Sequence, residues 1–350
     1  MSHAGVLRHF PSKDELLVAI LDRLTRSAAR QSRDGVRPDP REYLHLVADY
    51  TVARPGLIRL TVVLLGEATD PRHPAHQYVA DRLAGVKSAV EPLFGEDRSV
   101  DLVATWNGLQ LLFLYLADRV EPALQWTAAA EALEAVPASG APAAVDARIR
   151  REPAAVADTV EARIIAAAAT SFDAIGFRGS ALREIAASVG ISQGALLYHF
   201  PTKTDLLKAV LEGRDNDDSL PWVLGTTALD YLYGMYLQAL HNERNPGITR
   251  LFTVLACEAT DPLHPAHGYL VDRYDRFHAE LCSVFEALAA EGLTRAGLDH
   301  ESAAFRVIAL WDGLGMQRPY WADPVGIPER LRRALNELLT VELPREEPQE

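Results

Sequence analysis

The 350-residue sequence contains only two cysteines, Cys257 and Cys282, and neither belongs to a C-x-x-C pair. Two cysteines are too few to indicate a disulfide framework, and we interpret them as buried thiols in a reducing cytoplasm. Long apolar runs are also missing, because no stretch reaches the roughly 18 residues of a membrane span. The first residues lack the basic and then apolar order of a signal peptide. We therefore expect a cytoplasmic chain with no membrane partner, and its 48% hydrophobic content suffices for two domain cores.

The sequence also lacks a segment with the strict alternation of a β-strand, whereas helical periodicity recurs along most of its length. We expect an all-α fold. In the first part of the chain the pattern predicts helices over residues 12–33, 41–53, 56–68, 74–93, 100–117 and 122–136. In the second part it predicts helices over residues 202–213, 220–242, 247–259, 265–292, 300–318 and 327–342.

The most informative stretch runs from Gly190 to Leu206. Gly190 can adopt the positive φ that ends a helix, and the hydroxyl of Ser192 can cap the next one. Pro201 then stops this second helix after about two turns. The short helix keeps four polar side chains, which are Ser192, Gln193, Tyr198 and His199.

The residues upstream supply a support for this short helix, which is too short to be stable alone. Residues 159–172 form an amphipathic pattern that closes at Gly176, and Ser180 is predicted to cap a second short helix. Two short helices joined by a tight turn at Gly190 form a helix-turn-helix, whose second helix lies in the major groove of DNA.

The whole stretch resembles the DNA-binding domain of the tetracycline-repressor (TetR) family of bacterial regulators. Leu197 stands where that family usually has Tyr, and Tyr198 follows one position later. The matching residues are Phe172, Gly176, Phe177, Ser180, Ile185, Ala186, Gly190, Ile191, Ser192, Gly194, His199, Phe200, Pro201, Lys203, Leu206 and Leu207.

The resemblance implies double-stranded operator DNA as a partner. Gln193 suits an adenine edge, while Tyr198 and His199 suit bases or phosphates, although His199 could instead only cap or pack. Lys203 and the N-terminal amides of helices suit phosphates. The predicted DNA-binding residues are Arg178, Ser180, Ser192, Gln193, Gly194, Tyr198, His199 and Lys203.

The net charge of −13 does not oppose this interpretation. Between Arg148 and Lys208, eight Arg or Lys residues face six Asp or Glu residues, which leaves this segment at +2. The remaining residues therefore carry −15. The positive charge of residues 148–208 can contact DNA phosphates, and the acidic remainder of the chain can face away from them.

The sequence repeats itself. Residues 2–21 match residues 192–211 at an offset of 190, with ten identities in twenty, and residues 67–82 match 258–273 at an offset of 191, with twelve in sixteen. Residues 67–82 and residues 258–273 both read Glu-Ala-Thr-Asp-Pro-x-His-Pro-Ala-His-x-Tyr-x-x-Asp-Arg. Residues 106–109 then match 311–314 at an offset of 205. We interpret the chain as a tandem duplication of a TetR-like unit.

The first copy begins within its recognition helix, because Met1 aligns with Ile191. Either the start is placed too late or this half has decayed, and as it stands residues 3–9 are not expected to read DNA. The predicted organisation is a first copy (1–136, with a helix-turn-helix remnant at 1–11 and a ligand and dimerisation domain at 12–136), a linker (137–157), a helix-turn-helix domain (158–207), a second ligand and dimerisation domain (208–342) and a tail (343–350).

The resemblance further implies a small apolar effector that binds between the middle helices, and a dimer made by the last two helices. The residues proposed for the effector pocket are Tyr236, Phe252, Leu255, Trp311 and Asp312, although aromatics at such spacing are usually core. We expect either an intrachain pseudo-dimer or a homodimer of chains.

Glu258, Asp261, His264 and His267 are all residue types that can bind a metal, but their spacing also suits caps and turns. We therefore predict no metal site, no cofactor and no catalytic residue. The function expected from the sequence is a transcriptional repressor that a small molecule releases from DNA. The alternative is an interaction or decoy protein of the same fold whose incomplete first half prevents operator binding.

Overall fold

The computed structural model describes residues 53–120, 142–145, 159–215, 227–244, 246–321 and 326–346, together with positions 10, 12, 15–17, 19–21, 23 and 125. Within these residues the fold is all-α, as predicted, and the only β-type pairs are two isolated bridges, Pro142 to Glu342 and Thr294 to Leu339. None of the described helices combines the length and the hydrophobicity that a membrane crossing requires.

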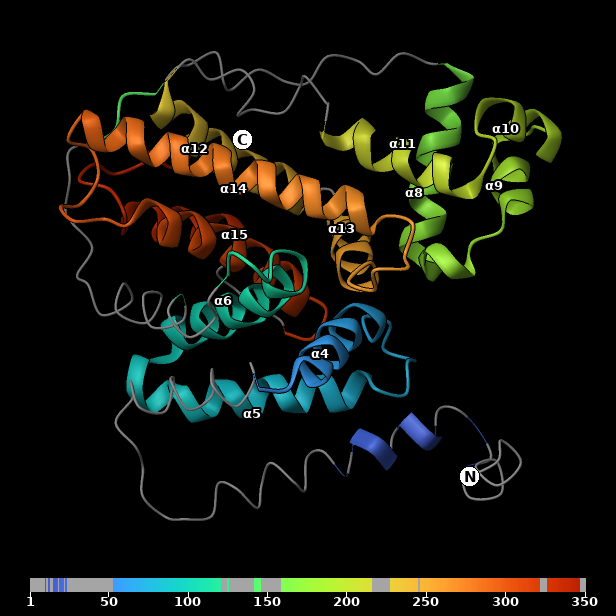
Figure 1. Ribbon diagram of the computed structural model, residues 1–350, viewed down its shortest axis with the longest axis horizontal. Coiled ribbons are helices and arrows are strands. Elements are labelled where there is room, and N and C mark those ends of the chain that lie inside the picture. Colours follow the sequence, from blue (N-terminus) through green and yellow to red (C-terminus); the bar gives the residue numbers. More distant parts are fainter. Residues whose placement is uncertain are drawn as a thin grey trace.

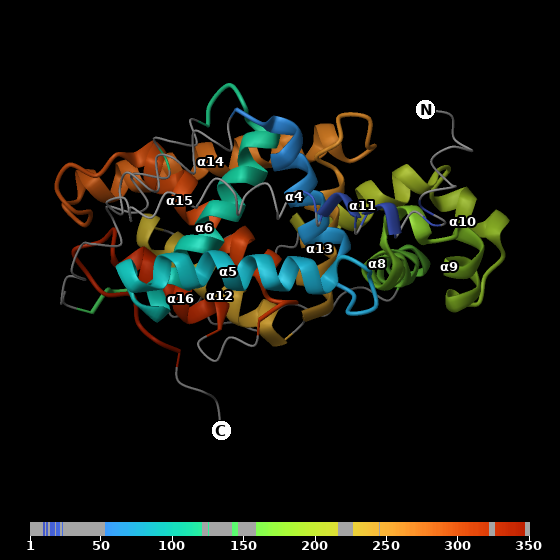
Figure 2. The ribbon, with the colours of Figure 1, turned by 90° about the horizontal axis from the view of Figure 1, so that it is seen from below.

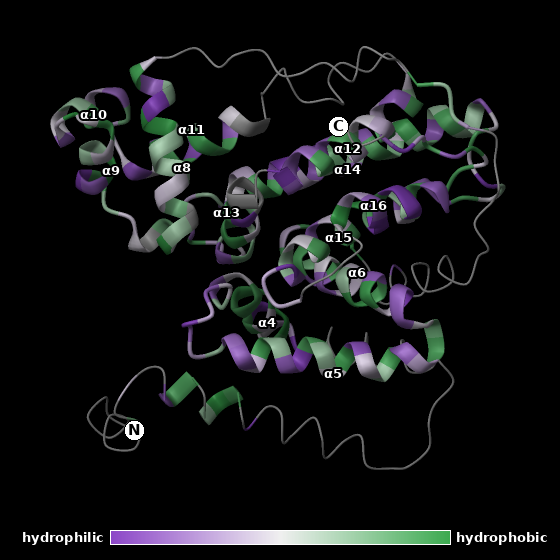
Figure 3. Ribbon diagram, turned by 180° about the vertical axis from the view of Figure 1, so that it is seen from behind, coloured by the Kyte–Doolittle hydropathy of each residue, from purple (hydrophilic) through white to green (hydrophobic). Residues whose placement is uncertain are grey.

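The first half of the chain contributes three described helices, α4 (Pro55–Glu67), α5 (His76–Phe94) and α6 (Glu96–Tyr115). They agree with the predicted ranges, except that α6 starts earlier, directly after Gly95, whose φ of 79° separates it from α5. The outer helix α5 alternates hydrophilic and hydrophobic stretches along its length, as Figure 3 shows. It buries Val79, Leu83 and Val90. The helices predicted at 12–33, 41–53 and 122–136, the remnant at 1–11 and the linker lie mostly outside the described residues.

The second half contributes nine described helices, and most of them match the predicted ranges. They are α8 (Val160–Gly179), α9 (Leu182–Val189), α10 (Gln193–His199), α11 (Lys203–Asp215), α12 (Ala228–Arg244), α13 (Pro246–Glu258), α14 (His267–Ala290), α15 (His300–Gln317) and α16 (Ile327–Asn336). Figure 1 shows α8 to α11 at one end of the molecule, with α6 and α15 side by side at its centre.

The helix predicted over 327–342 is too long, because α16 ends at Asn336. The side-chain oxygen of Asn336 accepts a hydrogen bond from the Leu343 amide at 2.9 Å, and Leu339 pairs with Thr294. Leu338, Leu339 and Leu343 are buried in this non-helical segment. The apolar residues that suggested a longer helix therefore reach the core without one.

Helices α6 and α15 cross at close range and join the two halves. A Cβ atom at Gly108 would come within 3 Å of the Ala309 backbone, and one at Gly313 would come equally close to Ala104. At the offset of 205, Gly108 corresponds to Gly313 and Ala104 to Ala309. The same contact is thus made twice with the roles of the helices exchanged.

Other contacts between the halves are reciprocal in the same way. The Tyr115 hydroxyl donates to the Ala256 carbonyl at 2.6 Å, and the Tyr320 hydroxyl donates to the Leu65 carbonyl at 3.0 Å. Both pairs correspond at the offsets of the sequence repeat. The two tyrosine rings also pack against the equivalent histidines of the opposite halves, which are His267 and His76.

Helix α4 lies against its sequence equivalent α13, and Gly66 faces its own counterpart there, Cys257. Helix α13 also packs on α8 and on α15. In Figure 2 α13 lies beside α8 and α4. It is therefore a single element in contact with the first half, the helix-turn-helix and the centre of the fold.

Candidate DNA-binding site

The turn between α9 and α10 has the geometry that its residues predict. Gly190 adopts a left-handed conformation with φ 79° and ψ 26°, and its amide bonds the carbonyls that end α9. The Ser192 hydroxyl caps α10 by accepting a hydrogen bond from the Ala195 amide at 3.1 Å. Helix α10 ends at His199, two residues before Pro201. These features confirm the predicted helix-turn-helix.

Buried apolar residues from α8 and α9 support α10. Leu196 is the residue of α10 that is fully buried. The apolar residues buried in the supporting helices are Ile164, Ala168, Phe172, Ile185 and Ala186. Because one side of α10 is fixed in this way, the orientation of its opposite side is fixed as well.

The outer side of α10 presents the polar residues that were predicted to contact DNA. Ser192, Gln193 and Gly194 are exposed, and Tyr198 is 86% exposed. His199 is less free, because its Nδ1 atom lies 3.2 Å from the Glu161 carboxylate on α8. These residues form a small, rigid and polar surface of the kind that enters a major groove.

The prediction that Ser180 caps α9 is wrong. The N-cap residue of α9 is Ala181, and Ser180 is 4% exposed. The Ser180 hydroxyl donates to the Gly176 carbonyl at 2.9 Å and accepts from the Ser171 hydroxyl at the same distance. The chain bends at Gly176, where φ is 73°, and the Ser180 hydroxyl bonds the carbonyl at this bend.

Lys203 starts α11 and turns toward the protein in this structure. Its ammonium group lies 4.6 Å from the centre of the Phe177 ring. Burial lowers the pKa of Lys203, and the carboxylate of Glu258 on α13 partly offsets that effect. The predicted phosphate contact of Lys203 stays a prediction. The side chain of Arg178 lies outside the described part of the structure.

Comparison with known proteins places this geometry in a family. A sequence profile for bacterial regulatory proteins of the tetR family matches residues 164–210, and a profile for the C-terminal part of BetI-type transcriptional repressors matches residues 266–344. The uncharacterized HTH-type transcriptional regulator TtgW of Pseudomonas putida is 31% identical over 130 residues, which cover 36% of this chain and 95% of TtgW. The chain belongs to the TetR family. It is a DNA-binding transcriptional regulator with a helix-turn-helix.

Two further proteins are similar to this TetR-family chain. The HTH-type transcriptional regulator SrpR of Pseudomonas putida is 28% identical over 156 residues, which cover 44% of the chain and 72% of SrpR. A solved tetR-family regulatory protein from Rhodococcus RHA1 is 27% identical, with a TM-score of 0.40, and its match covers 54% of this chain and 100% of its own.

The structure describes the surroundings of the five residues predicted for the effector pocket. Trp311 packs with residues of the α6 and α15 crossing, and Asp312 lies near Tyr115 and Tyr274, where its charge adds to burial in raising the pKa of both hydroxyls. In the second half the Phe252 ring lies under the Arg273 guanidinium at 4.4 Å. Leu255 and Tyr236 are buried in the core. A ligand role for these residues stays a prediction.

The repeated Asp-Pro-x-His-Pro-Ala-His motif builds the same turn in both halves. In the second half, Asp261 accepts the Leu263 amide, His264 accepts the Ala266 amide, and His267 bonds the Ala259 carbonyl. The equivalent three bonds occur in the first half, at Asp70, His73 and His76. These polar side chains are used to join one helix to the next.

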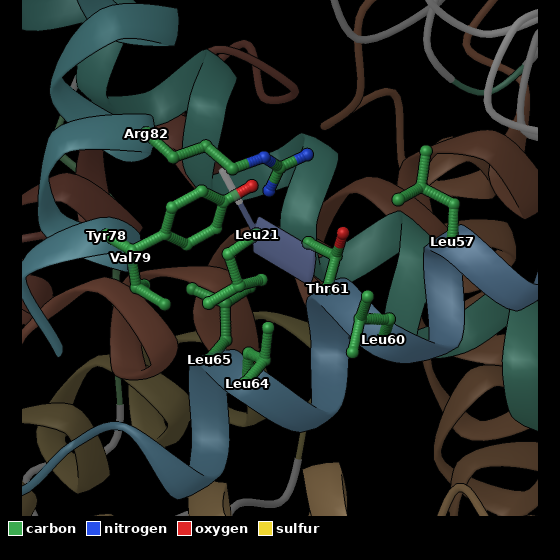
Figure 4. Close-up of a pocket in the computed structure, with 9 residues that line it drawn as sticks. All are labelled: Leu21, Leu57, Leu60, Thr61, Leu64, Leu65, Tyr78, Val79 and Arg82. Carbon is green, nitrogen blue, oxygen red and sulfur yellow. The ribbon is translucent and has the colours of Figure 1, made fainter. Parts of the chain in front are cut away.

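A feature that sequence reasoning missed lies in the first half, between α4 and α5. Figure 4 shows the residues that line a small cavity, with the side chain of Arg82 at one end. The volume of this cavity is about 20 Å³. Its polar groups are Arg82, Tyr78 and Thr61. The remaining wall is apolar and consists of Leu21, Leu57, Leu60, Leu64, Leu65 and Val79. One signal could have pointed to it, because Thr61 occupies the position that Phe252 holds in the second half.

Proposed function

We propose that this TetR-family regulator is a repressor that occupies operator DNA and leaves it when a small molecule binds the helical body. The observation that carries the proposal is the exposed polar side of α10 on a well-supported helix-turn-helix. Gln193 at the N-terminal end of α10 can bond a base edge, and Tyr198 can reach a base or a phosphate. We assign Ser192, Gly194 and His199 to the same contact surface.

We also propose that the chain is a tandem duplication that forms its own dimer-like core. The reciprocal contacts of Gly108 with Ala309 and of Gly313 with Ala104 support this arrangement, because such exchange of roles is typical of an interface with two-fold symmetry. The domain limits proposed from the sequence remain 12–136 and 208–342 for the two helical bodies, and 158–207 for the helix-turn-helix.

Release from DNA would pass through α13. This helix packs on α8 of the DNA-binding domain, on α4 of the first half and on α15. Lys203, in the DNA-binding domain, lies over the Phe177 ring, and the charge of Glu258 at the end of α13 partly offsets the effect of burial on the pKa of Lys203. A shift of α13 on ligand binding would therefore change the orientation of α10 relative to the body.

The experiment is a binding assay with the DNA that flanks the gene of this protein, cut into short labelled fragments. Fluorescence anisotropy at moderate salt should give saturable binding to one fragment, and a non-specific duplex of equal length should bind at least about a thousandfold more weakly. The double variant Gln193→Ala with Tyr198→Ala should lose the preference while it stays folded by circular dichroism. Equal binding to all fragments by the unaltered protein would contradict the proposal and favour an interaction or decoy role.

A further inference from the structure

The two halves differ at one position beside an arginine that both contain. Arg82 on α5 corresponds to Arg273 on α14, and Thr61 on α4 corresponds to Phe252 on α13. In the second half the Phe252 ring covers the Arg273 guanidinium at 4.4 Å. In the first half the smaller Thr61 leaves the cavity of about 20 Å³ shown in Figure 4, and Arg82 borders it.

Among the described residues, Arg82 has no carboxylate at ion-pair distance and no side chain at hydrogen-bond distance. The absence is unusual for a partly buried arginine, because a buried charge normally has a partner. Burial lowers the pKa of Arg82, while the nearby Tyr78 hydroxyl has a small opposite effect. A guanidinium remains charged under such conditions. The cavity therefore contains one positive charge without a compensating negative one among the described residues.

The other described groups around the cavity restrict which anion could pair with Arg82 there. Thr61 and Tyr78 add two hydroxyls that can donate hydrogen bonds, and the rest of the wall is aliphatic. One positive charge balances a monoanion, whereas a dianionic phosphate would stay half-neutralised in apolar surroundings. A planar carboxylate fits the two parallel N–H groups of a guanidinium.

We propose that the first half binds a small monocarboxylate with a short unbranched apolar chain, with its carboxylate on Arg82 and its chain along the leucines of α4. The proposal rests on the proposed function, in which the helical body binds the effector. The cavity in this structure holds about one water molecule, so the chain must displace side chains. Leu57 and Leu60 are only partly buried and can change rotamer to admit it.

The two halves would then have different roles, with DNA binding in the second half and ligand binding in the first. The second half carries the helix-turn-helix that the family profile matches, and there Phe252 occupies the space of the ligand. In the first half Arg82 borders the cavity. Because α4, which lines the cavity, packs directly on α13, and α13 packs on α8, a ligand in the first half has a short route to the DNA-binding domain.

The test begins with isothermal titration calorimetry on the full chain without DNA, with sodium butyrate, hexanoate and octanoate as probes. Octan-1-ol has the longest chain without the charge, and octylammonium reverses the charge. We expect octanoate to bind at one site per chain and more tightly than butyrate, and the two uncharged or cationic probes to bind at least about tenfold more weakly. Binding of octan-1-ol as tight as that of octanoate, or no binding by any carboxylate, would overturn the proposal.

Matched variants locate the site. Arg82→Gln should weaken octanoate binding by about tenfold or more, Arg82→Lys should restore part of it, and the equivalent change in the second half, Arg273→Gln, should leave it unchanged. Thr61→Phe copies the second half and should abolish binding. Phe252→Thr copies the first half and should add a second site per chain. If Arg273→Gln weakens binding and Arg82→Gln does not, the assignment of the site is wrong.

A DNA readout separates this proposal from the proposed function. Octanoate should lower the affinity of the unaltered chain for its selected DNA fragment, and should have no effect on Arg82→Gln. If octanoate binds through Arg82 but does not change DNA affinity, the carboxylate site stands and release by this effector fails. If octanoate lowers the DNA affinity of Arg82→Gln as well, the cavity is not the sensor. Circular dichroism melting checks that each variant is folded, and Thr61→Val, which keeps the cavity and removes the hydroxyl, replaces Thr61→Phe if that variant is not.

Discussion

Gly108 on α6 lies so close to Ala309 on α15 that a Cβ atom at Gly108 would come within 3 Å of the Ala309 carbonyl group. The helices can approach in this way only because glycine has no side chain. The equivalent contact of Gly313 with Ala104 lies on the other side of the same crossing. The crossing holds the two halves of one chain together, and it is therefore the most direct place to test their association.

Gly108→Ala and Gly313→Ala should each destabilise the protein by about 2 to 3 kcal/mol, because the new methyl group forces two backbones apart. Gly85→Ala is the matched control. It lies inside α5, where an added Cβ would meet nothing within 4 Å, so it should raise stability by about 0.5 to 1 kcal/mol. Urea unfolding followed by circular dichroism measures all three. A loss of stability at Gly85 equal to that at Gly108 would show that the effect does not depend on the close crossing of α6 and α15.

The second prediction concerns the mass in solution. If α6 and α15 satisfy each other within a chain, the protein should be a monomer of about 38 kDa at low micromolar concentration by light scattering. A homodimer would scatter with twice that mass, about 77 kDa. A clean dimer that persists on dilution would contradict the intrachain pseudo-dimer.

The third prediction is a pH dependence at His278, which is buried and stacks on Phe305. Burial and, secondly, the charge of Arg119 lower the pKa of His278 below its ordinary value of 6.5. Below pH 6.5 His278 is protonated in the unfolded chain but stays neutral in the folded protein. The free energy of unfolding should therefore fall as the pH drops from 6.5 through the lowered folded pKa. Above pH 6.5 this contribution should be constant.

The control for that dependence is His278→Gln, which removes the titrating group. It should be less stable than the parent at pH 7.5 and should show a weaker loss between pH 6.5 and 5, measured by urea midpoints. Arg119 belongs to the first half and also forms an ion pair with Asp275. An unchanged slope in the variant would assign the acid sensitivity to another group.

The fourth prediction separates base reading from phosphate binding. Gln193→Ala should cost about 1 to 3 kcal/mol on the preferred DNA and relax the preference at one base pair, while the salt dependence stays the same. Tyr198→Phe, which keeps the ring and removes the hydroxyl, serves as a milder change on the same surface. Competition assays with single base-pair substitutions measure the preference. A uniform loss on all sequences in Gln193→Ala would show that Gln193 contacts the backbone.

The fifth prediction concerns Lys203, whose ammonium group faces Phe177 in the structure. If it turns to a phosphate in the complex, Lys203→Ala should reduce the slope of log affinity against log salt by about one and weaken all sequences alike. Lys208, exposed on the same helix, provides the control, and Lys208→Ala should leave the slope unchanged. An unaltered slope together with lower stability would assign Lys203 to the contact between α11 and α13 instead.

The helix-turn-helix was predictable because its signals are local. The left-handed turn at Gly190, the cap at Ser192 and the stop before Pro201 each act within a turn or two of the chain. The fold class and most helix limits follow from periodicity for the same reason. Ser180 was assigned wrongly because its hydroxyl had two places to bond, and the bend at Gly176, with its neighbour Ser171, decided between them.

The sequence by itself determined that segments of the first half recur in the second half, and that one stretch has the pattern of a DNA-binding helix-turn-helix. Only the tertiary structure decided that α6 lies on α15, that α16 gives way to turns and isolated bridges after Asn336, and that Arg82 borders a cavity while Arg273 is covered. The physical reason is that burial depends on which distant segments meet. Thr61 and Phe252 are equivalent positions that differ by one side chain. Whether that difference covers an arginine or leaves a cavity depends on the helix that packs across it.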